Sequence, residues 1–148
     1  YNSDIICLQE VDKRVYEHDL LPALESVNFS GIYCPKGETS EGLAIFYDRR
    51  RFKLIDSQGI VLSKSIILNE AFSHIWDEIE NEEAKKRFRD RTTTLLVATL
   101  KSLDNPDEIV VLGNTHLYFH PDADHVRLLQ GYFALTACSD ITEYTKKL

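Results

Sequence analysis

The sequence predicts an α/β or α+β domain in which β-sheets pack under helices. Several short runs of β-branched and apolar residues are typical of strands, and helical patterns lie between them. The chain has 148 residues, of which 43% are hydrophobic and 28% charged. These values indicate a globular protein long enough for one domain (residues 1–148) with a sizeable core.

Four or five strands are expected in the first part of the chain. Residues 4–9 form a nearly continuous apolar run, which predicts a buried strand covered on both faces. Residues 29–34 and 42–47 predict the next two strands, and residues 52–62 one or two more.

A helix is expected over residues 19–27, between the first two of these strands. Leu20, Leu21, Leu24 and Val27 would share one side of it. Asp19 would cap its N-terminus and place Pro22 in the first turn, where proline is tolerated.

The second half of the chain begins with a change of composition. Residues 64–91 are predicted to be a helical insert, with one or two amphipathic helices over residues 66–90. Their mixed charges are expected to form a solvated face. A partner surface is the less favoured alternative. Residues 92–100 and 109–117 predict two strands joined by a turn at residues 104–107, and residues 122–144 predict a long helix. Its inward side chains would be Val126, Leu129, Phe133 and Ile141.

Cysteine content and net charge exclude some classes of protein. Cys7, Cys34 and Cys138 are odd in number and scattered, which argues against a disulfide scaffold and a CxxC metal site. The net charge of −7 is unusual for a protein that binds nucleic acid through general phosphate neutralisation. Action on nucleic acid would therefore need a local site and a metal ion. No apolar run is as long as the roughly 18 residues of a membrane span.

Glu10 is the first candidate for chemistry, because it follows directly after an apolar strand. Strand ends are where ligand sites form in α/β folds. A carboxylate there can bind Mg²⁺, which needs only one or two protein carboxylates. Taken alone, a glutamate after a strand is more often a surface or capping residue.

His116 is the second candidate, in the polar trio Asn114-Thr115-His116 that ends another apolar run. A histidine among uncharged polar neighbours can donate to a phosphate oxygen or transfer a proton. The alternative is a partly buried histidine with satisfied hydrogen bonds. Arg127, on the closing helix, either pairs with phosphate or covers the helix surface.

Common catalytic motifs are absent from the sequence. It has no P-loop, GxSxG elbow, HExxH, GxGxxG or zinc spacing. Phosphoryl chemistry without a nucleophile motif would proceed by metal-assisted attack of water.

Three segments taken together resemble the endonuclease/exonuclease/phosphatase superfamily: Leu8-Gln9-Glu10-Val11-Asp12, Glu41-Gly42-Leu43-Ala44-Ile45-Phe46-Tyr47 and Asn114-Thr115-His116-Leu117. Residues 4–12, 21–25, 114–121 and 127–130 are most similar to its 2′-phosphodiesterase and deadenylase branch. The resemblance covers nearly the whole chain and is weakest over residues 63–91.

This resemblance implies a two-sheet sandwich of mixed sheets flanked by helices, and hydrolysis of a phosphodiester that depends on Mg²⁺, with Mn²⁺ as an alternative. It implies that Glu10 binds the metal and that His116 contacts the scissile phosphate. Pro121 would line an adenine pocket and Asn114 would hold its strand end in shape. The residues expected to contact or border the substrate are Asn114, Pro121, Glu41, Gly42 and Arg127.

The resemblance also implies oligoadenylate or poly(A) RNA as substrate, no membrane partner, and an intracellular location, in the mitochondrial matrix or the cytoplasm. The family's Gly-Asp-Phe-Asn and Ser-Asp-His segments do not occur here. We therefore expect an N-terminal-to-middle portion of a catalytic domain, inactive without the remainder. The alternatives are an inositol-phosphate phosphatase or sphingomyelinase of the same superfamily, and a non-catalytic half-domain that binds a partner.

Overall fold

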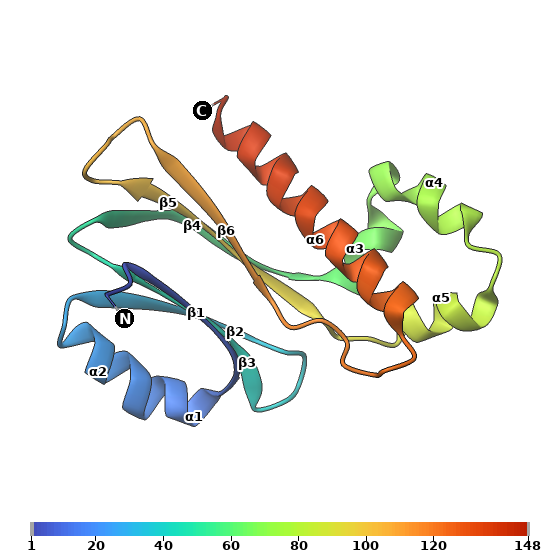
Figure 1. Ribbon diagram of the computed structural model, residues 1–148, viewed down its shortest axis with the longest axis horizontal. Coiled ribbons are helices and arrows are strands. Elements are labelled where there is room, and N and C mark those ends of the chain that lie inside the picture. The colour runs from blue at the N-terminus through green and yellow to red at the C-terminus, as the bar shows by residue number, and fades with distance from the viewer. Residues whose placement is uncertain (1, 148) are drawn as a thin grey trace.

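The computed structural model describes residues 2–147, apart from the side chains of Ile67, Glu70 and Ala71. Two three-stranded sheets form its centre (Figure 1). The first sheet has the order β1-β3-β2, with β1 (Ile5–Asp12), β2 (Phe29–Pro35) and β3 (Glu41–Asp48). The second has the order β4-β5-β6, with β4 (Phe52–Val61), β5 (Thr94–Ser102) and β6 (Ile109–Thr115).

The two sheets pack face to face through an apolar layer. This layer contains Leu43 and Ile45 of β3 and Leu96 and Ala98 of β5, all of them buried. The two residues of each strand are two positions apart and therefore face the same side of their sheet. This confirms the predicted sandwich with flanking helices. The expectation of mixed sheets was wrong for the described residues, because all four strand pairs are antiparallel. Parallel neighbours need a crossover connection, whereas a short turn joins β2 directly to β3.

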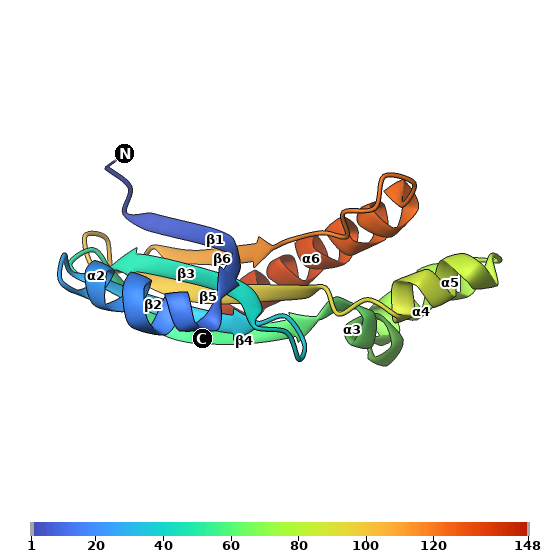
Figure 2. The ribbon, with the colours of Figure 1, turned by 90° about the horizontal axis from the view of Figure 1, so that it is seen from below.

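The prediction that the first strand is covered on both faces was also wrong. β1 lies at the edge of its sheet (Figure 2) and pairs, within the described chain, with β3. Cys7 and Gln9 are exposed. An apolar run does not by itself distinguish a central strand from an edge strand.

The first helical segment begins earlier than residue 19. It comprises α1 (Lys13–Val15), a wide π-turn η1 (Tyr16–Leu20) and α2 (Leu21–Glu25). Asp12 is its cap, since the Asp12 side chain accepts a hydrogen bond from the Arg14 backbone N–H at 2.8 Å. Asp19 lies inside the π-turn and Val27 is 54% exposed beyond the helix. Pro22 has no N–H to donate, and the wide turn lies just before it.

Three helices occupy the charged segment, where one or two were predicted. They are α3 (Leu62–Leu68), α4 (Glu70–Glu78) and α5 (Glu82–Arg89). Asn81 caps α5 by accepting from the Ala84 N–H at 3.0 Å, so the chain has a definite helix start there. That the segment is an insert remains a prediction.

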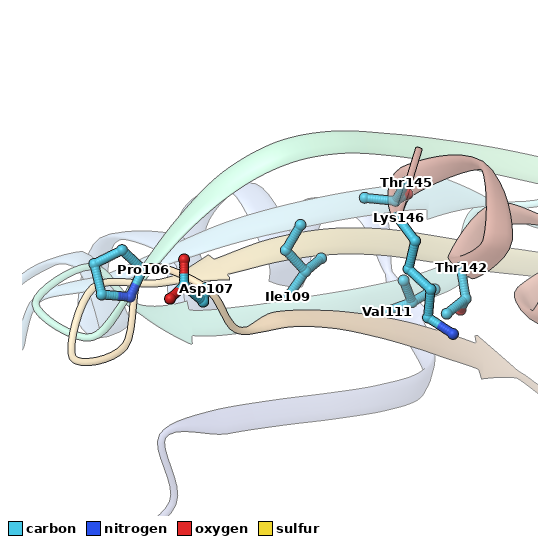
Figure 3. Close-up of a pocket in the computed structure, with 7 residues that line it drawn as sticks. All are labelled: Pro106, Asp107, Ile109, Val111, Thr142, Thr145 and Lys146. Carbon is cyan, nitrogen blue, oxygen red and sulfur yellow. The ribbon is translucent and has the colours of Figure 1, made fainter. Parts of the chain in front are cut away.

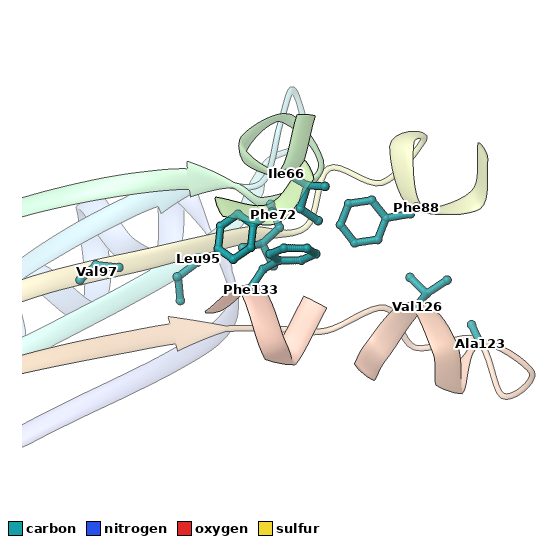
Figure 4. Packing of buried hydrophobic residues seen from close by; sticks show 9 residues of the cluster. Ile66, Phe72, Phe88, Leu95, Val97, Ala123, Val126 and Phe133 are labelled. Carbon is teal, nitrogen blue, oxygen red and sulfur yellow. The ribbon is translucent and has the colours of Figure 1, made fainter. Parts of the chain in front are cut away.

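The long helix α6 (Asp124–Thr145) packs against the second sheet and these helices. Phe72, Phe88 and Phe133 form the centre of this cluster (Figure 4), with the Phe72 and Phe133 rings 4.3 Å apart and perpendicular. Val126 and Phe133 are buried and Leu129 and Ile141 are partly buried, which confirms the inward face predicted for α6.

The three cysteines are free thiols, as their spacing predicted, and desolvation raises the pKa of each. Within residues 2–147, no helix is both long and apolar enough to cross a bilayer.

Candidate functional site

Glu10 and His116 lie next to one another although they are far apart in the sequence. The Glu10 Oε1 atom is 3.4 Å from His116 Nδ1. Glu10 comes from an irregular part of β1 where the register with β3 shifts between Leu8 and Val11. Its φ of 55° is in the left-handed region, which is uncommon for a residue with a side chain. A backbone outlier of this kind is a reason to look for function at that position.

Asn114 fixes the two strands that carry this pair. Its Nδ2 donates to the carbonyl oxygens of Leu8 at 2.9 Å and Ala44 at 3.1 Å, and its Oδ1 accepts from Gln9 Nε2 at 2.9 Å. The residue is only 3% exposed. Because Asn114 belongs to one sheet and its partners to the other, these bonds tie the sheets together beside the pair.

The pair itself is open to solvent. The Glu10 side chain is 66% exposed and that of His116 37%. Both line a cavity of about 330 Å³. The other charged and aromatic residues around it are Lys36, Glu41, Asp90, Arg91, Tyr118 and Phe119. A carboxylate and an imidazole in contact, within a concave site that also holds basic groups, can bind a cation and a phosphate together.

Glu41 lines this cavity, whereas Gly42 is buried beneath Tyr33. A Cβ atom at residue 42 would lie 2.5 Å from the Cys34 carbonyl oxygen and 2.5 Å from Tyr33 Cζ. The Tyr33 hydroxyl in turn donates to the carbonyl oxygens of Val11 at 3.2 Å and Ser40 at 3.1 Å. Glycine at residue 42 is therefore explained by close packing behind the site.

Pro121 and Arg127 do not line the cavity. The Arg127 guanidinium donates to the carbonyl oxygens of Tyr118 at 3.2 Å, His120 at 2.5 Å and Pro121 at 3.1 Å, and it pairs with Asp124. Arg127 therefore shapes the loop after β6, on which Pro121 is exposed.

Sequence reasoning missed Arg91. Its guanidinium lies 4.2 Å from the centroid of the Tyr118 ring, at the wall of the cavity. Arginine occupies every second position from Arg87 to Arg91, and nothing in the sequence pattern distinguishes Arg91 from Arg87 and Arg89.

The residues present can supply part of a metal site. Within the described residues, no group of three or more His, Cys, Asp or Glu side chains is placed to hold an ion. Mg²⁺ prefers oxygen ligands and often keeps several waters beside one or two carboxylates. Glu10, exposed beside His116, fits the role of one such carboxylate.

Larger hollows lie away from these residues. One of about 520 Å³ lies between β6, the preceding turn and the end of α6 (Figure 3). Its charged lining residues are Asp107 and Lys146, and Lys146 forms an ion pair with Glu143. This hollow does not bring together groups suited to catalysis.

No protein-family model matches the chain. It is 33% identical over 136 residues to mouse (Mus musculus) 2',5'-phosphodiesterase 12, covering 91% of this chain and 22% of that protein. It is 28% identical over 158 residues to the CCR4-Not complex 3'-5'-exoribonuclease subunit Ccr4 of Yarrowia lipolytica, covering 99% of this chain and 21% of the relative. The chain thus spans about a fifth of the length of these curated relatives.

Among solved structures, the human Nocturnin catalytic domain with a bound sulfate anion superposes with a TM-score of 0.73 at 24% identity. The match covers 97% of this chain and 47% of that domain.

Proposed function

Because this chain is a homologue of 2',5'-phosphodiesterase 12 and has the fold of the endonuclease/exonuclease/phosphatase superfamily, we propose that it carries half of the catalytic site of a metal-dependent phosphodiesterase. The proposed reaction is hydrolysis of 2′,5′-oligoadenylate or poly(A) by water, with release of AMP. The single observation that supports it best is the contact of Glu10, in the irregular part of β1, with His116, the residue after β6.

Glu10 would bind the metal ion, and His116 would stabilise the charge that develops on the phosphate. The Glu10 carboxylate would supply one oxygen ligand to Mg²⁺ or Mn²⁺. When bound, the ion supplies Lewis-acid polarisation of a phosphoryl oxygen and a water of lowered pKa. His116 would donate a hydrogen bond to the phosphate oxygen on which negative charge develops.

Asn114 would act indirectly in this proposal. All of its hydrogen-bonding groups are used on Leu8, Gln9 and Ala44. It would keep Glu10 and His116 within reach of the same phosphate, and orientation of this kind can supply about 7–11 kcal/mol of a barrier. Glu41 would border the substrate from across the cavity.

The test measures AMP release from 2′,5′- and 3′,5′-linked triadenylate in the presence of Mg²⁺ or Mn²⁺. It uses the intact protein, by which we mean the longer catalytic domain of which this chain is expected to be a portion. We expect hydrolysis of at least one linkage and its loss with a chelator. The 148-residue chain alone should be inactive, because in this proposal it supplies one metal ligand, Glu10. Release of inorganic phosphate from inositol phosphates, or of phosphocholine from sphingomyelin, would favour the other branches of the superfamily. Metal-dependent binding without turnover by the intact protein would contradict an enzymatic role.

A further inference from the structure

Arg91 is held in place in the wall of the cavity that Glu10 and His116 also line. Its Nε donates to the Arg87 carbonyl oxygen at 3.1 Å, and its guanidinium rests on the Tyr118 ring. The Arg91 carbonyl oxygen accepts from Ser63 Oγ at 2.7 Å. Both the backbone and the side chain of this arginine are therefore positioned before any ligand arrives.

The backbone of Tyr118, whose ring lies beneath Arg91, is itself anchored. The Tyr118 N–H donates to Gln130 Oε1 at 2.9 Å, and Gln130 Nε2 donates to Thr93 Oγ1 at 2.9 Å. Gln130 is buried, so these bonds fasten the loop after β6 to the start of β5. The contact with this ring and the bond from Nε together restrain the direction of the Arg91 guanidinium.

Within the described residues, the Arg91 side chain forms a hydrogen bond through Nε, and no hydrogen bond or ion pair uses its two terminal nitrogens. Glu10, Glu41 and Asp90 line the same cavity, yet none of them forms an ion pair with Arg91. A partly buried guanidinium with two free donor groups is suited to an anion, above all to phosphate, which it can bind through both nitrogens.

We propose that Arg91 binds a second phosphate of the substrate, next to the phosphate held at Glu10 and His116. This inference rests on the proposed function and specifies its substrate as an oligonucleotide with at least two phosphates. Arg91 lines the same cavity of about 330 Å³ as Glu10 and His116, so one substrate can contact all three residues. Lys36 adds positive charge from the neighbouring loop, where Gly37 packs close to Thr92.

The experiment compares two ligands that differ by one phosphate. Binding of phosphorothioate-linked diadenylate (one phosphorothioate) and triadenylate (two) to the intact protein is measured by calorimetry with Mg²⁺ present. Arg91→Gln should weaken triadenylate binding about tenfold and diadenylate binding less than about twofold. Equal weakening of both ligands, or no weakening, would overturn the proposal.

A charge-matched control and a second variant at the site accompany Arg91→Gln. Arg87→Gln removes the same charge from α5, but the Arg87 side chain pairs with Glu83 and does not line the cavity, so both affinities should stay within about twofold of wild type. If Arg91→Gln does not fold, Tyr118→Leu replaces it and should weaken triadenylate selectively; loss of both affinities alike would again overturn the proposal.

Binding and turnover can fail separately. A selective loss of triadenylate affinity in a protein that releases no AMP would support the Arg91 site and reject the hydrolytic function. AMP release by a protein whose two affinities respond equally to Arg91→Gln would support the hydrolytic function and reject the Arg91 site.

Discussion

Asn114 differs sharply from Glu10 and His116, although all three residues lie near the C-terminal ends of β1 and β6. Asn114 is buried and uses its whole amide on three hydrogen bonds. Glu10 is 66% exposed and touches His116 at 3.4 Å. The same strand ends thus carry a closed polar network and an open pair of titratable groups.

This difference distinguishes polar residues that stabilise the fold from polar residues that are available for chemistry. A buried polar group must be fully hydrogen-bonded, and removing its partners costs stability. An exposed carboxylate beside an imidazole contributes little to folding, because solvent screens the interaction. We therefore expect changes in the buried network to affect stability and changes in the open pair to affect activity.

The largest effect is expected for Glu10→Gln in the intact protein. The substitution removes a charged oxygen ligand while preserving size, so AMP release should fall about 10³-fold, or roughly 4 kcal/mol. The midpoint of thermal unfolding should be unchanged. Glu38→Gln, an exposed acid that does not line the cavity, is the matched control and should retain activity. Retention of more than about a tenth of wild-type activity by Glu10→Gln would contradict a metal-binding role.

Asn114→Ala should show the opposite pattern. It leaves the Leu8 and Ala44 carbonyl oxygens and the Gln9 amide without their partner, which should lower the free energy of unfolding by about 3 kcal/mol. Urea denaturation measures this change. Asn105→Ala in the exposed turn before β6 should cost less than about 1 kcal/mol. Similar losses for the two variants would remove the distinction between a buried network and a surface contact.

His116→Ala should lower kcat about 10²-fold with a much smaller effect on KM, because its help is greatest when charge develops on the phosphate. Steady-state kinetics on triadenylate separate the two parameters. An increased KM with unchanged kcat would make His116 a binding residue only.

The smallest effect concerns Asp48, a buried carboxylate that contrasts with Glu10. The Arg50 side chain donates to both Asp48 oxygens, and these bonds lower the pKa of Asp48 to about 2. Since the folded-state pKa is below the unfolded one, the stability it gives is present above about pH 4 and lost as pH falls towards 2. Asp48→Asn should therefore flatten the fall in melting temperature between about pH 4 and 2. An unchanged slope would show that this carboxylate does not stabilise the fold.

Local patterns predicted most elements of the fold, because apolar periodicity and turn residues act over a few positions. The inward face of α6 and the strand at residues 42–47 were found in this way. The edge position of β1 and the antiparallel pairing depend on contacts between distant segments, which an apolar run does not encode.

The candidate site was harder to predict from residue patterns. Glu10 and His116 were singled out as residues that follow apolar strands, and their closeness depends on the sheet-to-sheet bonds of Asn114. Arg91 had no local signal, since its position depends on Tyr118 from a different part of the chain. Arg127 looked suited to phosphate, but its donors are used on loop carbonyl oxygens.

The most direct test of the central claim is a double-mutant cycle of Glu10→Gln and His116→Ala, read as kcat/KM for triadenylate in the intact protein. If the two residues act on one phosphate as a unit, the double variant should be about as slow as the slower single variant. If their losses multiply, so that the two free-energy costs add within about 0.5 kcal/mol, Glu10 and His116 act independently and the proposed shared site is wrong.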